Sequence, residues 1–270
     1  MVNDPLPGVA AFDPSQPHVS RIYDYLLDGK DNYAVDRAVG DRIIATVPTI
    51  QMGVRAQRDL LRRVVRYLVG EAGLRQLIDI GSGLPTADNV HQIAQRAAPD
   101  CKVTYVDNDP VVLAHARALL ADDVATIVVG GDVREPKAIM DNPAIRSHFE
   151  WDQPVGLLLC GILHYILDSE SPRDLTESLC AALPSGSYVF IQHLLDSGDP
   201  VAAELQEAMR SGMETISFRT KEQIMSYFGG LGLVPPGLVL VPEWRPEADT
   251  PTAGAHPVLR LACAGVARKP

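Results

Sequence analysis

Hydrophobic positions along the chain change their spacing near residue 75, and the change predicts two kinds of structure. Before it, apolar residues recur every three or four positions, as in amphipathic helices. Helices are expected at 20–27, 34–46 and 53–71. The third has an apolar side made of Leu60, Leu61, Val64, Val65, Leu68 and Val69. The proline-rich residues 1–18 predict an irregular N-terminal arm.

After residue 75, short apolar runs alternate with helical patterns. The runs lie at 77–80, 103–106, 125–129, 155–159, 188–192, 238–241 and 258–263, and the helices at 88–97, 110–120, 137–149, 172–182 and 220–228. This alternation predicts an α/β fold, a mostly parallel sheet with helices on both faces. No clear helix joins the last two runs, so we expect them to pair antiparallel. The predicted organisation is an arm at 1–18, a helical cap or lid at 19–72 and a Rossmann-like core at 73–270, with cap and core forming one compact unit.

The segment LIDIGSGLPT, residues 77–86, contains the first candidate site. Ligands of open α/β sheets bind where strands end, and the turn glycines Gly81 and Gly83 let a ligand approach the backbone. The dinucleotide fingerprint needs a third glycine at position 86, where Thr86 stands, which disfavours a nicotinamide dehydrogenase. Asp79, Gly81, Ser82 and Gly83 instead give the D-x-G-x-G pattern of methyltransferases, whose cofactor S-adenosylmethionine has no phosphate. Pro85 is expected in the first turn of the next helix.

Acidic residues follow the next two predicted strands. A carboxylate at Asp107, beside Asn108, can accept both hydroxyl hydrogens of a ribose. Asp109, before Pro110, is expected to be a helix N-cap. Asp132 can accept the adenine amino hydrogens while the Val133 N–H donates to the ring. Each acid alone also fits a solvated strand end or a helix cap, but three in order favour a ligand.

Four segments resemble a large bacterial family of S-adenosylmethionine-dependent methyltransferases, formerly labelled a domain of unknown function. They are HVSRIYDYLLDGKDNY, LIDIGSGLPT, YVDNDPVVLAHARALL and PGLVLVPEWRP, and the likeness runs from about residue 17 to the end. The resemblance implies a class I methyltransferase-like Rossmann fold with a seven-stranded, mostly parallel sheet, an antiparallel last strand and extra N-terminal helices. It also implies cofactor contacts at Gly81, Gly83, Asp107, Asp132 and Val133. The third helix reads RAQR where the family pattern has RANR, so no role is assigned to Gln57. The family supplies no settled methyl acceptor.

Residues that could act on an acceptor follow the fourth and fifth runs. Cys160 is expected beside the methionine part of the cofactor, and His164 and Tyr165 face the acceptor. His164 is a candidate general base or orienting residue, because histidine titrates at about pH 6.5. His193 is a second candidate. For both, the alternative is a structural histidine bonded to a backbone carbonyl.

The N-terminal helices can close over the cofactor as a lid. Arg21, Tyr23, Asp24 and Asn32 are the candidates for acceptor contacts there, with Tyr23 also a candidate for catalysis, although Arg21 could equally pair with Asp24 on the helix surface. Trp244 is expected to line the acceptor pocket. Arginines of the third helix read as a solvated face: Arg55, Arg58, Arg62, Arg63 and Arg66.

The composition of the chain limits the classes of function that it can have. A formal net charge of −10 disfavours nucleic acid as a substrate unless those arginines form a basic face. The four cysteines form no C-x-x-C pair, so no metal site or disulfide framework is expected. Neither a signal peptide nor a membrane span is recognisable, which favours the cytoplasm. The sequence thus predicts an S-adenosylmethionine-dependent methyltransferase with a small-molecule acceptor. The alternative is a non-catalytic S-adenosylmethionine or S-adenosylhomocysteine sensor, and no homo-oligomer can be inferred.

Overall fold

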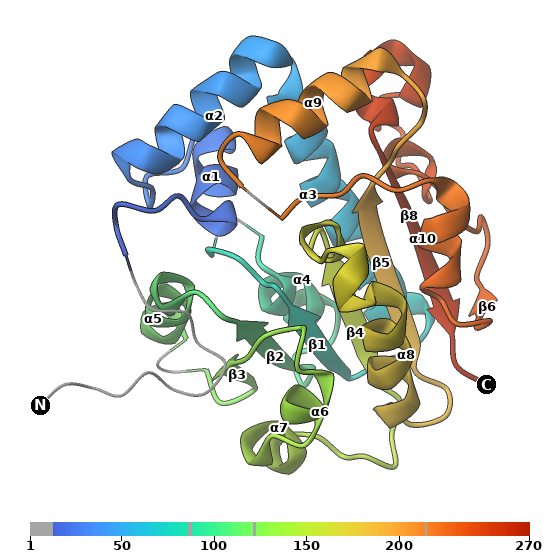
Figure 1. Cartoon of the computed structure of the whole chain (residues 1–270). Helices are drawn as coiled ribbons and strands as arrows, with labels where there is room; N and C mark the ends of the chain where they lie inside the picture. Colours follow the sequence, from blue (N-terminus) through green and yellow to red (C-terminus); the bar gives the residue numbers. More distant parts are fainter. Residues whose placement is uncertain (1–12, 86–87, 121–122, 214) are drawn as a thin grey trace, which may run out of the picture.

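A single sheet forms the centre of the computed structural model, which describes residues 13–85, 88–120, 123–213 and 215–270 (Figure 1). Its strands are β1 Gln76–Ile80, β2 Lys102–Asp107, β3 Thr126–Gly130, β4 Gly156–Cys160, β5 Tyr188–Leu194, β6 Gly232–Leu233, β7 Val239–Leu240 and β8 Ala262–Arg268. Their order is β3-β2-β1-β4-β5-β8-β6, and β7 also pairs with β8. The order reverses between β1 and β4, and ligands of open α/β sheets bind beside such a reversal.

Strand directions confirm the predicted sheet. β1 to β5 are parallel, whereas β8 runs antiparallel to β5, β6 and β7. Because β6 and β7 are short and both pair with β8, they act as one interrupted edge strand, and the sheet has the seven-stranded plan. The last two predicted apolar runs do pair antiparallel, as β7 and β8.

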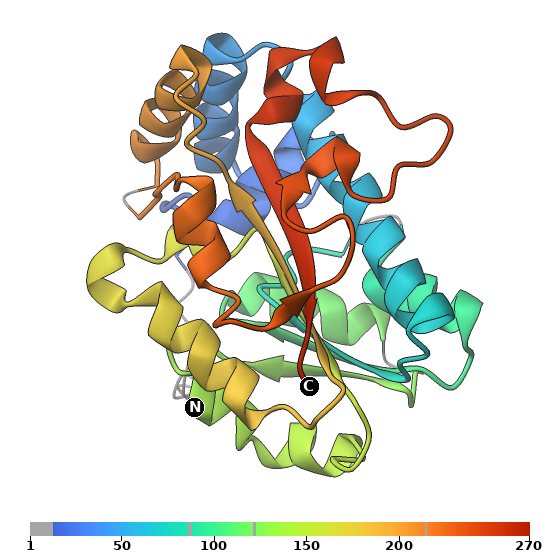
Figure 2. The same ribbon diagram turned by 90° about the vertical axis from the view of Figure 1, so that its right-hand side faces the viewer.

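Helices cover both faces of the sheet (Figures 1 and 2). On one face lie α3 (Ile50–Arg66) and α4 (Val90–Ala97), and on the other lie α6 (Pro136–Met140), α7 (Pro143–His148), α8 (Pro172–Ala182) and α10 (Lys221–Ser226). α5 (Pro110–Leu119) packs beside β3. α1 (Val19–Leu26), α2 (Ala34–Thr46) and α9 (Pro200–Arg210) gather beyond the carboxyl ends of the strands, above α3.

The apolar side of α3 joins the N-terminal helices to the sheet. Leu60 and Val64 are fully buried in the same hydrophobic cluster as Leu77 of β1 and Phe190 of β5. The helix continues as a π-helical turn, Tyr67–Glu71. No helix in the described part of the chain is long and apolar enough to cross a membrane.

Three expectations about local structure were wrong. α9 was not predicted, although Asp199 caps it and Pro200 occupies its first position. The helix expected at 137–149 is two helices, because Pro143 cannot continue α6 and Asn142 instead caps α7. The last strand starts at Ala262 rather than at 258, because residues Pro257–Arg260 form a 3₁₀ turn.

The segment after the glycine turn also differs from the expectation. α4 begins only at Val90, with Asn89 as its N-cap, so Pro85 precedes the helix instead of lying in its first turn. Thr86 falls outside the described residues, as do residues 1–12 of the predicted arm.

Candidate cofactor site

A cavity of about 900 Å³, including its part open to solvent, lies at the carboxyl ends of β1 to β4 beneath α1 and α3. Every predicted cofactor-binding residue lies in its wall: Asp79, Gly81, Ser82, Gly83, Asp107, Asn108, Asp132, Val133 and Cys160. Tyr23 and Tyr165, predicted to act on the acceptor, line it too. The residues predicted to bind the cofactor therefore converge on one cavity and, with the two tyrosines, make up half of its wall.

The glycine turn leaves room for a ligand. Gly83 has a φ of +67°, and a Cβ built on it would have no atom of the described residues within 4 Å. Gly81 has a φ of +72°, and its Cβ would lie 2.7 Å from Cδ1 of Ile162. Both conformations favour glycine. Gly81 is thus required by packing, whereas Gly83 opens its backbone to the cavity.

Asp107 is held in place by two backbone amides. The Gly83 N–H donates to Oδ2 and the Asp109 N–H donates to Oδ1, each at 2.9 Å. Each carboxylate oxygen keeps a second lone pair that can accept a hydrogen bond from a ligand. Burial raises the pKa of Asp107, while these two amides oppose the rise. The carboxylate is therefore already oriented and partly desolvated before a ligand arrives.

Asp79 is a second buried carboxylate of the wall with a raised pKa. Burial raises its pKa to about 7, the nearby Arg58 opposes the rise, and Asp107 adds to it. A carboxyl group with such a pKa is readily ionised by a cation placed next to it. Because Arg58 also lines the cavity, this end offers one acidic and one basic group side by side.

Asp132 lines the cavity beside β3, which is the strand farthest from β4 among those that border the site. Its Oδ2 accepts a hydrogen bond of 2.9 Å from the Asn108 side chain, and its Oδ1 accepts one of 2.9 Å from the Arg134 amide. The Arg134 guanidinium bridges Asp132 and Glu170, which fixes the loop after β3. Asn108 therefore acts on the site through Asp132.

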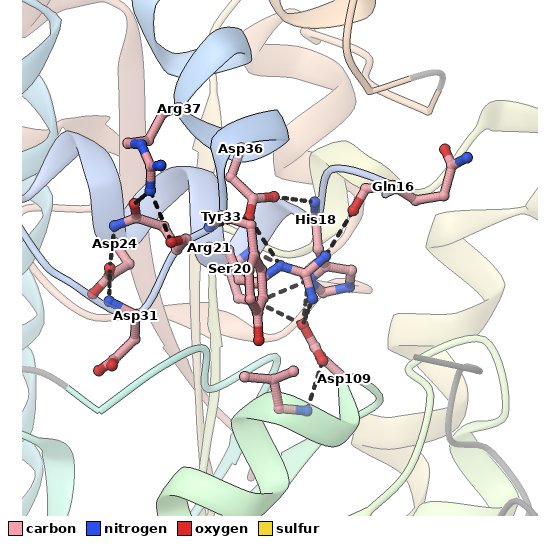
Figure 3. Close-up of polar contacts among 12 residues, drawn as sticks. Gln16, His18, Ser20, Arg21, Asp24, Asp31, Tyr33, Asp36, Arg37 and Asp109 are labelled. Carbon is pink, nitrogen blue, oxygen red and sulfur yellow. Dashed lines mark hydrogen bonds and ion pairs between the residues drawn. The ribbon is translucent and has the colours of Figure 1, made fainter. Parts of the chain in front are cut away.

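The start of α1 is fastened to the site by a buried ionic cluster (Figure 3). Asp109 caps α5, as predicted, by accepting the Val111 N–H through Oδ1 at 2.8 Å. Its Oδ2 accepts a hydrogen bond from the Ser20 hydroxyl, lies 2.9 Å from Nδ1 of His18, and forms an ion pair with Arg21 at 3.4 Å. Burial alone would raise the pKa of Asp109, but His18, the Val111 amide and Arg21 together hold it below its usual value. His18 and Ser20 thereby become part of the cavity wall.

Arg21 and Asn32 do not lie in that wall, which corrects the expectation that they contact the acceptor. The Arg21 guanidinium is buried between Asp36 and Asp109 and does not pair with Asp24 (Figure 3). Asp24 instead accepts hydrogen bonds from the Asp31 amide and the Asn32 side chain, at 2.9 and 2.8 Å, and so closes the loop after α1. Arg21, Asp24 and Asn32 support the site from behind.

His164 lies just behind the wall. A Cβ on Gly161, which lines the cavity, would be 3.6 Å from Cε1 of His164. Burial lowers the pKa of His164 well below its usual value, and His193 and Arg219 lower it further. Its Nδ1 has no hydrogen-bond partner among the described residues. The ring is therefore neutral and a weak base.

His193 and Trp244 were placed wrongly by sequence reasoning. His193 Nδ1 lies 2.6 Å from the Leu194 carbonyl oxygen and Nε2 lies 3.2 Å from Nη1 of Arg219, so its ring belongs to the opposite face of the sheet. This is the structural alternative that the sequence left open. Trp244 is fully buried and packs edge-on against Tyr67, away from the cavity.

Sequence reasoning missed three charged residues of the wall, Arg58, Arg134 and His18. Arg58 was assigned to a solvated face, but its spacing from Val54 and Leu61 places it on the buried side of α3. That spacing was the available signal. Arg63 is also buried and donates to the carbonyls of Val241 and Trp244. Of the five arginines predicted to lie on a solvated face of the helix, only Arg55, Arg62 and Arg66 do so.

Comparisons with known proteins identify the relatives of the chain. A family model described as S-adenosyl methyltransferase matches residues 8–270. A candidate methyltransferase from Thermobifida fusca is 40% identical, with a TM-score of 0.91 over 94% of this chain and 96% of that one. A DUF574-family protein from Streptomyces avermitilis is 37% identical, with a TM-score of 0.90 over 96% and 99%.

More distant structures share the fold alone. Human N-acetylserotonin methyltransferase, solved in complex with S-adenosylmethionine, is 17% identical, with a TM-score of 0.50 over 94% of this chain and 63% of that one. Together these likenesses confirm the predicted class I methyltransferase-like fold. No curated protein sequence is significantly similar to the chain.

Proposed function

The chain belongs to the S-adenosyl methyltransferase family, and we propose that it transfers the methyl group of S-adenosylmethionine to a small-molecule acceptor. One observation supports the proposal above the others. Asp79 near the end of β1, Asp107 at the end of β2 and Asp132 just after β3 line one cavity, beside a glycine turn that is open to a ligand. The net charge of −10 favours a small acceptor over a nucleic acid.

The wall offers a suitable group to each part of the cofactor. Asp107 accepts hydrogen bonds from the ribose hydroxyls, and Asp132 with the Val133 amide binds the adenine ring. Asp79 binds the amino group of the methionine part, and Arg58 binds its carboxylate. The bound cofactor supplies a methyl group already activated by its sulfonium. The protein has to orient the acceptor and exclude water.

We assign hydrogen-bonding and orienting roles to the aromatic groups near the acceptor. Burial raises the pKa of both Tyr23 and Tyr165, so their hydroxyls stay protonated. The Tyr165 hydroxyl can donate to an acceptor atom, and the Tyr23 hydroxyl can do so by giving up its 3.4 Å hydrogen bond to the Val54 carbonyl. The lowered pKa of His164 makes it a poor general base. An orienting role for its neutral ring fits the position behind Gly161 better.

Binding measurements test the cofactor assignment directly. We expect S-adenosylhomocysteine, the demethylated product, to bind the purified protein with a dissociation constant in the micromolar range, measured by calorimetry. NAD⁺ serves as the comparison ligand, because its pyrophosphate needs the third glycine that Thr86 replaces. Absence of S-adenosylhomocysteine binding, or tighter binding of NAD⁺, would contradict the proposal.

Turnover separates an enzyme from a sensor that has kept only the cofactor site. S-adenosylmethionine carrying a labelled methyl group is incubated with the protein and a bacterial small-molecule extract. We expect label to enter a small molecule only when the protein is present and not heat-inactivated. Cofactor binding without any labelled product would support the sensor.

A pH titration tests the role of Asp79. Its pKa of about 7 means that an ammonium group must displace a proton below that pH. Affinity for S-adenosylhomocysteine should therefore fall about tenfold per pH unit on going below pH 7, and level off above it. The Asp79→Asn variant should lose this pH-dependent component.

The same variant should be more stable without ligand. A carboxyl whose pKa is raised in the folded state destabilises the protein increasingly as the pH rises from about 4 to 7. Removing the charge should stabilise the ligand-free protein at pH 8 by about 1–2 kcal/mol, after the cost of burying an amide. Asp100→Asn, at an exposed site, is the control and should change neither stability nor affinity. A destabilised Asp79→Asn would refute the assignment.

A further inference from the structure

A second cavity adjoins the cofactor site on the α3 face of the sheet. It measures about 420 Å³, including its part open to solvent. Its wall includes Ile50 and Val54 of α3, Leu194 at the end of β5, Leu205 of α9, and Val258 and Leu261 of the C-terminal loop. Figure 2 shows this loop lying against the start of α3. Among the described residues that line the cavity, Gln57 alone is polar.

Gln57 lines both cavities, so they meet at its side chain. The amide lies beside the end of β4, where Nε2 is 3.8 Å from Sγ of Cys160. A Cβ on Gly161 would lie 2.6 Å from the same Nε2. The methionine end of the cofactor site, which contains Cys160 and Gly161, is therefore separated from the apolar cavity by this one side chain.

Unsatisfied polar groups gather at the same point. Gln192 on β5 is fully buried, and neither atom of its amide has a hydrogen-bond partner among the described residues. Gln192 lines neither cavity, but its Oε1 would lie 3.3 Å from a Cβ on Gly161, so it lies directly behind the wall of the cofactor cavity at this point. Buried amides without partners are costly and rare in folded proteins. A ligand group that donates to Oε1 of Gln192 would remove part of that cost.

The chemistry of the two glutamines limits the ligand. Each glutamine amide offers a carbonyl acceptor and an NH₂ donor, and all of these groups are uncharged. A hydroxyl or neutral amine matches such a pair, because it can donate to Oε1 of Gln192 and accept from Nε2 of Gln57. An ionised group would be buried without a counter-charge from either amide. The remaining wall can accommodate only an apolar skeleton.

We propose that the methyl acceptor is an apolar small molecule with one uncharged hydroxyl or amine group. Its oxygen or nitrogen bonds to the methyl carbon as the bond from that carbon to sulfur breaks, and the proton of the group passes to water at the open side of the cofactor cavity. Its skeleton occupies the apolar cavity, and its polar group lies between Gln57 and Gln192 beside Gly161, facing the cofactor. This inference rests on the proposed function, because it identifies the acceptor class of that site. Gln57 and Gln192 are acceptor-binding residues in this arrangement.

Binding of model acceptors to the protein saturated with S-adenosylhomocysteine tests the proposal. The probes are 2-naphthol, 4-butylphenol and 1-octanol, and 2-naphthoate is the charged comparison. We expect at least one neutral probe to bind, and 2-naphthoate to bind at least about tenfold more weakly than 2-naphthol, the equivalent of one lost hydrogen bond. Binding of none of the three, or equal binding of 2-naphthoate, overturns the proposal. Lack of S-adenosylhomocysteine binding in the first step refutes the proposed function instead.

The Gln192→Leu variant distinguishes ligand binding from a structural role. It should weaken the neutral probe about tenfold, leave S-adenosylhomocysteine affinity unchanged, and raise the melting temperature because it removes unpaired buried groups. Gln153→Leu replaces an exposed glutamine and should change none of the three. Unchanged probe affinity in Gln192→Leu overturns the inference, as does a lowered melting temperature.

Discussion

Replacing Asp107 by asparagine is expected to weaken S-adenosylhomocysteine binding about 100-fold, which corresponds to a loss of about 3 kcal/mol from two charge-assisted hydrogen bonds. The carboxylate is buried and already oriented by the amides of Gly83 and Asp109. Asparagine keeps the shape but puts an NH₂ group where one of those N–H groups needs an acceptor. It also removes the charge that strengthens contacts with the ribose. Calorimetry at constant pH measures the loss.

A change in the ligand separates the ribose contact from damage to the glycine turn. S-adenosylhomocysteine is compared with its 2′,3′-dideoxy analogue in both proteins. If Asp107 contacts the hydroxyls, deleting them should weaken binding strongly in the wild type and little in Asp107→Asn, so the two losses are not additive. Additive losses would mean that Asp107 acts only by holding Gly83 in place, and the ribose assignment would be wrong.

The backbone of the site could be predicted because it follows from short-range rules. Parallel strands end at one edge of a sheet, so residues at the carboxyl ends of β1, β2 and β3 had to approach one another. Asp79, Asp107 and Asp132 occupy such positions, and all three line the cavity. The dipeptide Asp109-Pro110 likewise specified the start of α5. For these positions, the sequence around each strand end was sufficient to predict the local structure.

Side-chain partners could not be predicted, because they depend on contacts between segments far apart in the chain. His193 lies near the carboxyl end of β5 like a site residue, yet strand alternation turns its ring to the opposite face, where Arg219 meets it. Arg21 has an acid three residues later, but tertiary folding brings it Asp36 and Asp109 instead. The spacing of three residues favoured Asp24 as the partner of Arg21. In the folded protein, the buried carboxylates of Asp36 and Asp109 share the Arg21 guanidinium instead.

The cluster around Arg21 leads to the largest expected effect on stability. Arg21→Met should lower the free energy of unfolding by about 3–5 kcal/mol, because it leaves two buried carboxylates without their cation. The side chains of Arg21, Asp36 and Asp109 are each at most 4% exposed. Urea denaturation at neutral pH measures the change. Arg55→Met is the matched control, since Arg55 and Asp28 form an exposed pair at 2.7 Å that contributes about 1 kcal/mol at most.

A double substitution shows whether unpaired charge is the cause. In Arg21→Met/Asp36→Asn the second change removes one stranded carboxylate, so part of the lost stability should return. Because Asp109 also holds His18 and Ser20 in the cavity wall, the single variant should bind S-adenosylhomocysteine more weakly even where it is fully folded. If Arg21→Met lost no more stability than Arg55→Met, this cluster would not be what fastens α1 to the core. Unchanged affinity would show that α1 keeps its place over the cofactor without Arg21.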